Sequence, residues 1–375
     1  MSEFSIGLMS GTSMDGVDAV LADFSAGKPR VMQHASAALG DALRAELLAL
    51  NTCGTDELHR AALAANGLVR IYAMLVEQLL TNSGTARTQV LAIGAHGQTV
   101  RHQPQRFDGC GYSIQLNNPA LLAELTGIDV VADFRSRDVA AGGQGAPLVP
   151  AFHREMFAQA DASVAVLNLG GIANLSVLAP LAAAASKRDV IGFDCGPGNA
   201  LMDHWCQQHL GQPFDAGGQW AASGQVLGRL LQQLGADPFF ALPAPKSTGR
   251  DLFNPHWLAH KLLAHGQARA QDVQATLTEL TAMSCSDAVK RFAPGRASLI
   301  VCGGGALNAC LMHRLGTRLP GVRVESSESH GLPPQQVEAA AFAWLARRTV
   351  RRESGNLTSV TGARGERILG AIYPA

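Results

Sequence analysis

The feature of this chain that most limits its fold is a repeated pattern of two apolar segments joined by a glycine-containing turn. The first copy consists of residues 4–9 and 17–24 around a polar turn at 10–16. The second copy consists of residues 163–169 and 172–178, separated by two glycines. Short apolar runs bounded by turn residues are typical of buried strands. Mixed strand and helix patterns follow each copy, so the sequence predicts a duplicated α/β architecture with a cleft between two lobes.

Length and composition also favour two lobes and a small ligand. The chain has 375 residues, of which 47% are hydrophobic, and single hydrophobic cores rarely grow beyond about 250–300 residues. The 30 basic residues balance the 30 acidic ones. Binding to nucleic acid or to an anionic membrane needs a basic surplus. We therefore expect a small-molecule partner, no nucleic acid and no membrane.

Three features predict a cytoplasmic protein. The N-terminal residues lack a basic segment followed by an apolar one, so no signal peptide is expected. The uncharged stretch 162–186 is long enough to cross a bilayer, but its glycine, asparagine and proline residues favour two strands around a turn. The 7 cysteines show neither a CxxC pair nor a zinc-binding spacing.

Three turns, at residues 10–16, 168–174 and 302–308, each follow an apolar strand and have the composition of a phosphate-binding loop. Glycine lets the backbone approach a ligand closely and present its N–H groups. We expect the third turn to open a helix, whose N-terminus favours anions. Any one turn could simply connect two strands, but three of them favour a nucleotide. Neither a Walker A motif nor a complete GxGxxG motif is present.

Carboxylates lie beside these turns. Asp15 and Asp18 flank the first turn, where Mg²⁺ or its bound waters could be held. Asp194 is expected at the end of a strand at 190–194, facing the cleft, where a carboxylate could take a proton from an attacking nucleophile. A role for Asp194 as a helix N-cap or turn residue is the alternative.

Further polar residues follow other predicted strands. His96 and Gln98 offer neutral donors and acceptors suited to sugar hydroxyls, although a buried structural histidine is equally compatible with the pattern. Arg135, close to Asp133, could bind a substrate carboxylate with two hydrogen bonds, or the two could form a structural ion pair. Glu338 is expected in the first turn of a helix, where an acid normally complements the helix dipole.

Taken together, these segments resemble the anhydro-N-acetylmuramic acid kinase family over essentially the whole chain. The resemblance rests on residues 7–18, 95–99, 133–135, 168–174, 193–199, 246–250 and 302–305. It implies a two-lobed actin/hexokinase-like (ribonuclease H-like) fold. We expect an N-terminal lobe of residues 1–135 plus 339–375 and a C-terminal lobe of residues 136–338.

The resemblance also implies a reaction and a set of site residues. Anhydro-N-acetylmuramic acid, water and ATP would give N-acetylmuramic acid 6-phosphate and ADP, with Mg²⁺ as cofactor, in a homodimer that serves cell-wall recycling. Asp194 would be the catalytic base, next to Cys195, where the family more often has threonine. The residues expected to bind the nucleotide are Gly11, Thr12, Ser13, Met14, Asp15, Gly16, Val17, Asp18, Gly170, Gly171, Gly303, Gly304 and Gly305. Those expected to bind the sugar are His96, Gln98, Asp133, Arg135, Asn174 and Glu338.

Other functions fit parts of the sequence. An ordinary sugar kinase acting on free N-acetylmuramic acid would use the same residues. A nucleotide-dependent chaperone or filament protein of the same fold would need an appendage, for which the tail after residue 350 is too short. The segment Lys246-Ser247-Thr248-Gly249 is similar to a motif of penicillin-recognising serine enzymes, but the accompanying Ser-Asp-Asn element is missing.

Overall fold

The computed structural model of this chain consists of two compact units. Unit 1 contains Met1–Met156 and Gln335–Ala375, and unit 2 contains Phe157–Pro334. The residues that the structure describes are 3–11, 14, 16–183, 190–244, 246–249, 252–295 and 298–375.

The boundaries of the units differ from the expected 135/136 and 338/339, because residues 136–156 belong to unit 1. A buried carboxylate explains the difference. Asp138, in α4 (Ser136–Ala140), accepts hydrogen bonds from Asn356 Nδ2 and Thr361 Oγ1, both at 2.7 Å. Since Asp138 is fully buried, these bonds attach α4 to the C-terminal segment of the same unit.

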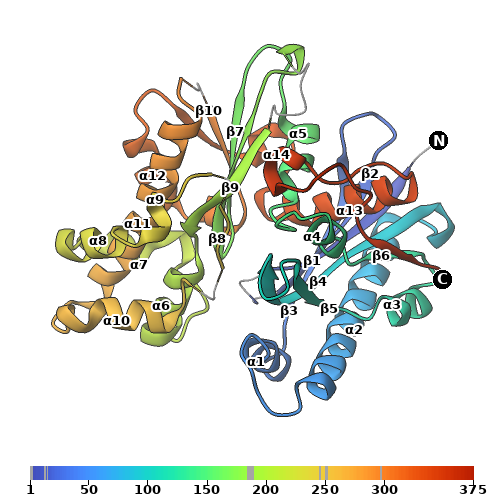
Figure 1. Cartoon of the computed structure of the whole chain (residues 1–375), viewed down its shortest axis with the longest axis horizontal. Helices are drawn as coiled ribbons and strands as arrows, with labels where there is room; N and C mark the ends of the chain where they lie inside the picture. The colour runs from blue at the N-terminus through green and yellow to red at the C-terminus, as the bar shows by residue number, and fades with distance from the viewer. Residues whose placement is uncertain are drawn as a thin grey trace. The chain divides into compact units, whose positions relative to one another are not determined.

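Unit 1 is built on a 7-stranded sheet with the order β12-β6-β4-β1-β2-β3, in which β5 also pairs with β4 (Figure 1). The first two strands form the predicted antiparallel hairpin, whereas β4 runs parallel to β1 and to β6. The strands are β1 (Phe4–Ser10), β2 (Gly16–Asp23), β3 (Arg30–Ala38), β4 (Val90–Pro104), β5 (Gly111–Leu116), β6 (Val130–Ala132) and β12 (Ala371–Tyr373).

Helices cover both faces of this sheet. Ile6 and Leu8 of β1 belong to the hydrophobic core that includes α2, and successive strand residues point to opposite faces. Gly7 therefore points the other way, toward α13, where a Cβ atom on it would lie 1.8 Å from the carbonyl oxygen of Ala339. Gly94 of β4 meets α13 in the same way. The helices of unit 1 are α1 (Asp41–Ala49), α2 (Glu57–Ser83), α3 (Pro119–Thr126), α4, α5 (Val149–Phe157), α13 (Val337–Val350) and α14 (Thr358–Thr361).

Helix α2 is long and apolar enough to cross a membrane by length and composition, the one such helix in the part of the chain that the structure describes. Half of its most apolar window is buried inside unit 1. Its buried side chains, among them Leu68, Tyr72 and Leu75, belong to the core under the sheet. A buried core helix can be as long and as apolar as a membrane-spanning one. Packing in the core of unit 1 therefore explains the apolar composition of α2.

Unit 2 is built on a 5-stranded sheet with the order β11-β10-β7-β8-β9. Strand β8 is antiparallel to both β7 and β9, and β10 is parallel to β7 and β11. The strands are β7 (Val164–Leu169), β8 (Ile172–Leu178), β9 (Val190–Pro197), β10 (Ser298–Cys302) and β11 (Arg323–Ser326).

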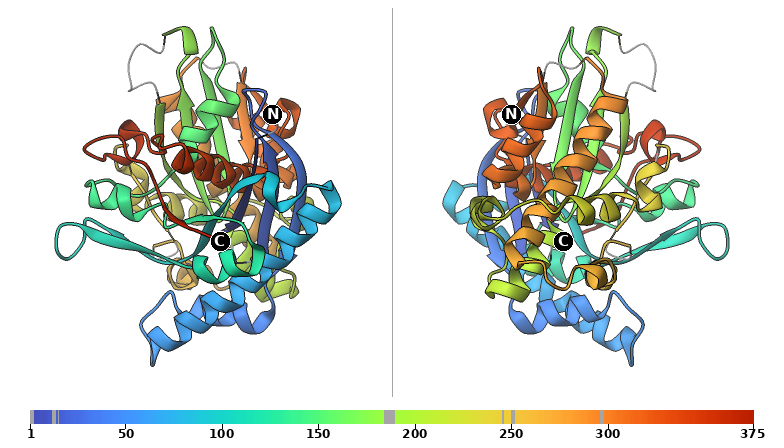
Figure 2. Two further views of the ribbon diagram at one scale, coloured as in Figure 1. Left: turned by 90° about the vertical axis from the view of Figure 1, so that its right-hand side faces the viewer. Right: turned by 90° about the vertical axis from the view of Figure 1, so that its left-hand side faces the viewer.

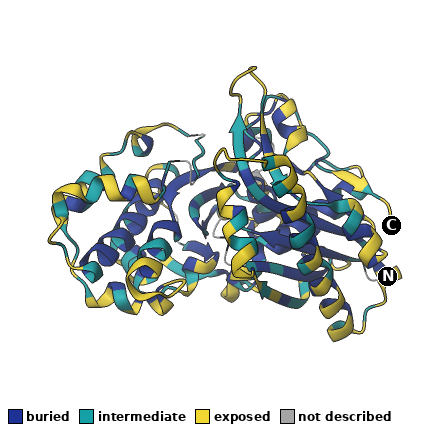
Figure 3. Ribbon diagram, turned by 90° about the horizontal axis from the view of Figure 1, so that it is seen from below, coloured by how far each residue is buried: buried dark blue, intermediate teal, exposed yellow. Residues whose placement is uncertain are grey.

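One face of the unit 2 sheet packs against a layer of helices, seen in two further views in Figure 2. The long helix α11 supplies much of this core, and its buried side chains include Leu277 and Leu280. The burial pattern in Figure 3 shows dark strands and helices that are buried on one side only. The helices of unit 2 are α6 (Ala200–Leu210), α7 (Gln219–Ser223), α8 (Gly228–Gly235), α9 (Pro238–Ala241), α10 (Pro255–Leu262), α11 (Ala270–Phe292) and α12 (Ala309–Arg318).

The two sheets share one strand order. In unit 1 it is β3-β2-β1-β4-β6, and in unit 2 it is β9-β8-β7-β10-β11. In each sheet the first three strands along the chain are antiparallel to their neighbours, and the last two strands of the order run parallel to β1 in unit 1 and to β7 in unit 2. This ribonuclease H-like order confirms the predicted duplicated α/β architecture. A cleft between the units stays a prediction.

Candidate active site

A row of polar residues crosses the antiparallel strands of unit 2. Asn168 on β7 lies opposite Asn174 on β8, and Asn174 lies opposite Asp194 on β9. Directly opposed residues of neighbouring strands point to the same face of a sheet. Because Phe193 and Cys195 contribute to the core with α11, Asp194 points to the other face. The register of the sheet thus brings together Asn174 and Asp194, two of the predicted site residues.

Asp194 lies inside β9 and not at its end. The sequence predicted that the strand would stop at residue 194, but it continues to Pro197. Proline and glycine in the next three positions mimic a turn in the sequence, yet the strand persists because its pairing with β8 resumes at Gly196 and Pro197, after a register shift that leaves Cys195 without an opposite residue. The Asp194 side chain is buried, with 8% of the residue exposed. A carboxylate in such a place is largely shielded from bulk water.

The segment 246–249 holds Asp194 from outside the sheet. The backbone N–H of Thr248 donates to Asp194 Oδ2 at 2.9 Å. The N–H of Asp194 itself donates to the Lys246 carbonyl, also at 2.9 Å. The sequence did not reveal this role, although it singled out residues 246–249 as an unusual motif.

The second and third glycine turns meet at the end of β7. Gly303 has a φ of +80°, and a Cβ atom on it would lie 2.7 Å from the Leu169 carbonyl oxygen. A Cβ atom on Gly305 would lie 2.6 Å from the Leu169 side chain. Only glycine allows this turn to lie directly against the residue that precedes Gly170.

Asn199 joins these turns to the end of β9. Its Nδ2 atom donates to the Leu169 carbonyl at 2.9 Å, and its backbone N–H donates to the Gly170 carbonyl at 2.8 Å. Gly198 N–H likewise donates to the Gly171 carbonyl at 3.0 Å. The structure therefore gathers Gly170, Gly171 and the 303–305 turn into one backbone-lined region.

The third turn leads into a helix, as expected, because α12 begins at Ala309, directly after the turn at 302–308. Within the turn, residues Gly304–Leu307 form a 3₁₀ helix. Asn308 is the N-cap of α12, and its side chain accepts a hydrogen bond from the Leu311 N–H at 3.0 Å. This cap uses one of the free N–H groups at the start of α12, which lies four residues after Gly305.

In unit 1 the first turn is tied to β4. Ser10 Oγ donates to Gln98 Oε1, and Gln98 Nε2 donates to the Gly11 carbonyl at 3.1 Å. The Met14 N–H closes the turn on the same carbonyl at 3.2 Å. A Cβ atom on Gly16 would lie 2.7 Å from the Ala37 carbonyl oxygen on β3. Two further predicted nucleotide-binding residues are Val17 on β2, which is buried, and Asp18. Thr12, Ser13 and Asp15 lie outside the described residues.

The buried His96 contacts the partly buried Arg135. The Arg135 guanidinium contacts His96 Nε2 at 2.9 and 3.3 Å and donates to the Gly145 carbonyl at 2.7 Å. Burial, together with the positive charge of Arg135, lowers the pKa of His96 to about 3. His96 is therefore a neutral imidazole at physiological pH. The ring also packs against Phe342 of α13, with centroids 4.6 Å apart.

Asp18, the described member of the predicted metal pair, contacts an imidazole. His34 Nε2 on β3 lies 3.1 Å from Asp18 Oδ1. The Asp18 side chain is 37% exposed, so solvent or a ligand can reach it. No group of three or more histidine, cysteine, aspartate or glutamate residues with metal-ligand geometry occurs among the residues that the structure describes.

The remaining predicted sugar-binding residues lie at the ends of elements. Asp133 follows β6 with a φ of +58°, and its carboxylate accepts a hydrogen bond from Ser136 Oγ at 2.6 Å. The Asp133 carboxylate therefore bonds to the Ser136 hydroxyl, whereas the Arg135 guanidinium contacts His96. Glu338 lies in the first turn of α13 and is partly buried. The tight approach of Gly7 and Gly94 to α13 fixes the position of this turn.

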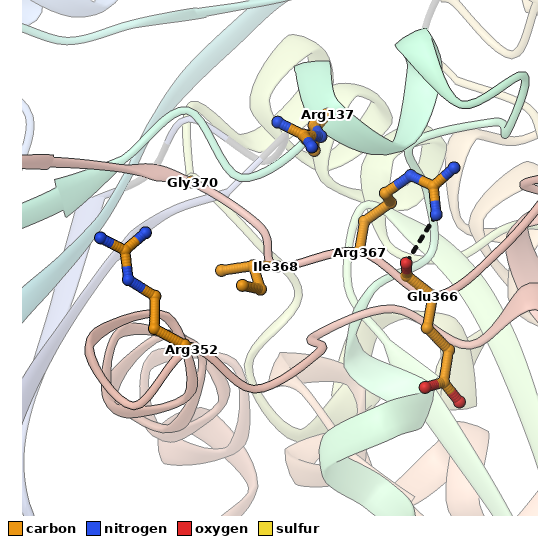
Figure 4. Close-up of a pocket in the computed structure, with 6 residues that line it drawn as sticks. All are labelled: Arg137, Arg352, Glu366, Arg367, Ile368 and Gly370. Atoms are coloured by element: carbon orange, nitrogen blue, oxygen red, sulfur yellow. Dashed lines mark hydrogen bonds between the residues drawn. The ribbon is translucent and has the colours of Figure 1, made fainter.

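A separate cavity of about 380 Å³ in unit 1 contains none of the predicted site residues. Figure 4 shows Arg137, Arg352 and Arg367 around it, and one guanidinium N–H of Arg367 donates to the backbone carbonyl of Glu366 at 2.7 Å. The Glu366 carboxylate points away from the three arginines in this view. The cavity is lined by Arg137, Arg352, Glu366, Arg367, Ile368 and Gly370.

Comparison with known proteins gives a full-length match. Residues 3–375 match the family model described as anhydro-N-acetylmuramic acid kinase. A protein of that name from Variovorax paradoxus (strain S110) is 67% identical over 373 residues, which cover 100% of this chain and 99% of the relative. One from Albidiferax ferrireducens is 63% identical over 389 residues and covers 100% of both chains.

Solved structures resemble the chain only distantly. The activator of the 2-hydroxyisocaproyl-CoA dehydratase from Clostridium difficile with bound ADPNP has a TM-score of 0.49 and 13% identity, covering 93% of this chain and 96% of that chain. A ROK family glucokinase from Streptomyces griseus in complex with glucose and AMPPNP has a TM-score of 0.41 and 14% identity, covering 92% and 99%. The fold assignment rests instead on the strand order of each unit.

Proposed function

This chain belongs to the anhydro-N-acetylmuramic acid kinase family, and we propose that it uses ATP and water to convert anhydro-N-acetylmuramic acid into N-acetylmuramic acid 6-phosphate and ADP. The observation that carries the proposal is the match of residues 3–375 to the family model together with 67% identity to a relative of that name over the whole chain. It is an ATP-dependent sugar kinase that serves cell-wall recycling.

We assign the role of general base to Asp194. In this proposal its carboxylate removes a proton from a water molecule that attacks the anomeric carbon of the anhydro sugar. The intramolecular ether opens, and the oxygen released at position 6 attacks the γ-phosphorus of ATP. The hydrogen bond from Thr248 N–H to Oδ2 supports this assignment because it restricts the orientation of the carboxylate. Shielding from bulk water also suits a reaction in which one selected water is a substrate.

We assign nucleotide binding to the glycine turns. Phosphoryl transfer depends mainly on alignment and charge stabilisation, which backbone N–H groups can supply without rearrangement. Gly170, Gly171 and the 303–305 turn form one backbone-lined region in unit 2, and residues 11–18 would bind phosphate in unit 1. The Ser10–Gln98–Gly11 hydrogen bonds support the second assignment because they fix the start of the first turn.

We assign sugar binding to His96, Gln98, Asp133, Arg135, Asn174 and Glu338. The Oδ1 atom of Asn174 is buried and has no hydrogen-bond donor in the described parts of the chain. A buried acceptor without a donor is unfavourable unless a ligand or water supplies one. Its place beside Asp194 therefore favours a substrate hydroxyl or amide as the missing donor.

Mg²⁺ fits the residues around the first turn. The ion prefers carboxylate oxygens, phosphate oxygens and water, and one or two carboxylates suffice when a nucleotide supplies the rest. Asp18 offers a partly exposed carboxylate of this kind, and Asp15 would be the second. The bound ion would neutralise charge on the phosphates. We further propose a cytoplasmic homodimer, by analogy with the family.

Mass spectrometry of the products tests the activity. Incubation of anhydro-N-acetylmuramic acid with ATP in ¹⁸O-labelled water should give a sugar phosphate that has gained one water and one phosphoryl group, with the label on the anomeric hydroxyl. Phosphorylation of free N-acetylmuramic acid without reaction of the anhydro sugar would indicate an ordinary sugar kinase. Label in inorganic phosphate would indicate simple ATP hydrolysis. Either result would overturn the proposal.

A further inference from the structure

The segment 246–249 is packed against β9 at the point where the proposed base lies. Asp194 exchanges two hydrogen bonds with it, one through its backbone N–H to the Lys246 carbonyl and one through its carboxylate from the Thr248 N–H. The segment is 52 residues away along the chain and belongs to neither a helix nor a strand. Something must therefore hold it in place, since an unanchored loop would lose this geometry to conformational entropy.

The Gly249 carbonyl accepts hydrogen bonds from Leu252 and Phe253 at the far end of the segment, and the side chain of Lys246 anchors its near end. Its Nζ atom donates to the carbonyls of Phe239 and Phe240 at 3.0 and 3.3 Å, which lie in the short helix α9. The same ammonium lies 4.4 Å from the centroid of the Phe239 ring. A lysine that binds the carbonyls at the end of a helix satisfies groups that the helix leaves open. Burial lowers the pKa of Lys246, as expected for an ammonium held away from water.

Helix α9 is itself fixed to the core of unit 2. Its N-cap Asp237 accepts hydrogen bonds from the Phe239 N–H at 3.0 Å and from Trp257 Nε1 at 2.9 Å. The Phe239 and Phe240 rings pack against Phe253, with centroids 5.5 and 5.6 Å apart. A chain of direct contacts thus runs from the aromatic core through α9 and Lys246 to the Thr248 amide.

Close packing also fixes α9 against β9. Gly196 has a φ of +141°, and a Cβ atom on it would lie 2.7 Å from the Phe240 ring. Phe240 therefore rests on the strand two residues beyond Asp194. Helix α9, which binds Lys246, is therefore in contact with β9, which carries the Asp194 carboxylate. This contact fixes the distance between the helix and the strand.

From these contacts we propose that Lys246 is a positioning residue, whose bonds to α9 hold the Thr248 N–H on the Asp194 carboxylate. The inference rests on the proposed role of Asp194 and adds the group that orients it. It predicts that loss of the ammonium lets the segment move, so the carboxylate loses a fixed direction toward its water. Misplacement of a reacting group by about 1 Å can lower a rate by about 10²-fold.

The test compares Lys246→Met and Lys246→Arg with the wild-type enzyme. Lys246→Met keeps most of the apolar stem and removes the donor. We expect it to lower kcat by about tenfold or more while KM for ATP stays within about twofold, since positioning at the reacting centre affects the transition state more than nucleotide binding. Lys246→Arg, which can still donate to the two carbonyls, should recover a measurable part of kcat.

Lys261→Met is the matched control. Lys261 lies 5.6 Å from the centroid of the Trp257 ring, in the same aromatic cluster, but contacts neither α9 nor the 246–249 segment through any hydrogen bond among the described residues. We expect wild-type kinetics from it. Thermal melting and ATP binding of all three variants show whether each is folded.

Three outcomes would overturn the inference. These are a wild-type kcat in Lys246→Met, an equal loss in Lys261→Met, and a loss that appears only in KM for ATP. Parallel measurement of Asp194→Asn separates the two proposals. If that variant is inactive while Lys246→Met is fully active, only the positioning role fails. If Asp194→Asn is fully active, the assignment of the base itself fails.

Discussion

The packing of α13 on β1 leads to a sharp prediction about Gly7. A Cβ atom at this position would lie 1.8 Å from the Ala339 carbonyl oxygen and 2.6 Å from the Ala343 nitrogen. Both atoms are helix backbone, which cannot rotate away as a side chain can. An ordinary contact of about 3.4 Å requires the helix and strand to separate by about 1.5 Å. Overpacked cores typically lose about 1–3 kcal/mol, and we expect Gly7→Ala to lie at or above the upper limit.

Thermal melting measures this effect. For a unit of this size, 1 kcal/mol corresponds to about 2–4 °C, so Gly7→Ala should lower Tm by about 6–12 °C. Gly67→Ala is the control, because Gly67 lies inside α2 and a Cβ atom on it meets Leu43 only at an ordinary 3.4 Å. Alanine favours a helix over glycine by up to about 1 kcal/mol, so this variant should melt at or above the wild-type temperature.

Gly94→Ala provides a second check, because its Cβ atom would lie 2.0 Å from the Phe342 carbonyl oxygen on the same helix. Either substitution alone displaces α13, so the double variant should lose less stability than the sum of the two. A Gly7→Ala protein that melts within 1 °C of the wild type would refute the reasoning, as would full additivity of the two losses.

Three further predictions follow from other contacts. Asp194→Asn should lower kcat by at least about 10²-fold with ATP binding largely retained, because it removes the proposed base; steady-state kinetics with wild-type turnover would contradict this. Gly304→Ala should raise KM for ATP at an unchanged Tm, since its Cβ atom meets only Asn199 Nδ2 at 3.7 Å yet would project from the proposed nucleotide turn; a KM equal to the wild type would count against the turn. Burial lowers the pKa of His153 to about 3, below its usual value of about 6.5, so stability is full above pH 6.5 and falls as pH drops toward 3. Between pH 7 and 5 this residue should account for about 2 kcal/mol of lost stability. Urea unfolding should show that the free energy of unfolding of His153→Leu falls less between pH 7 and 5 than that of the wild type. The same pH dependence in both proteins would contradict the prediction.

The elements that the sequence predicted are those whose signal is local. Both hairpins appear within one residue of the expected limits, because each consists of apolar strands around an intervening turn. Strand β3 (Arg30–Ala38) was not predicted, since seven of its nine residues are polar, charged or small and its alternation is weak. Strand β12 lies in the tail after residue 350, for which no strand was predicted. It exists because Ala371–Tyr373 pairs with Val130–Ala132 of β6, a partner about 240 residues away.

The candidate site divides in the same way. Local motifs singled out Asp194, Asn174 and the glycine turns, because special backbone geometry demands particular residues. The contacts between them depend on sheet register and on distant segments. Nothing in residues 190–199 indicates that Thr248 donates to Asp194, and nothing in residues 96–99 indicates that Arg135 reaches His96. These contacts arise from the tertiary fold, which short sequence patterns do not record.

The two sheets share a strand order but differ in how the polar side chains on their strands are hydrogen-bonded. This difference bears on which unit supplies the general base. In unit 1, Ser10 lies opposite Gln98, and the two side chains bond to each other and to the turn. In unit 2, the polar row across β7, β8 and β9 leaves Asn174 Oδ1 without a donor in the described residues, directly opposite Asp194, whose carboxylate accepts a hydrogen bond from the Thr248 N–H. A closed polar network stabilises a turn, whereas an open one next to a buried carboxylate has capacity left for a ligand. This difference supports the proposal that the base lies in unit 2, on β9 beside the second hairpin, whereas the first hairpin contributes to phosphate binding.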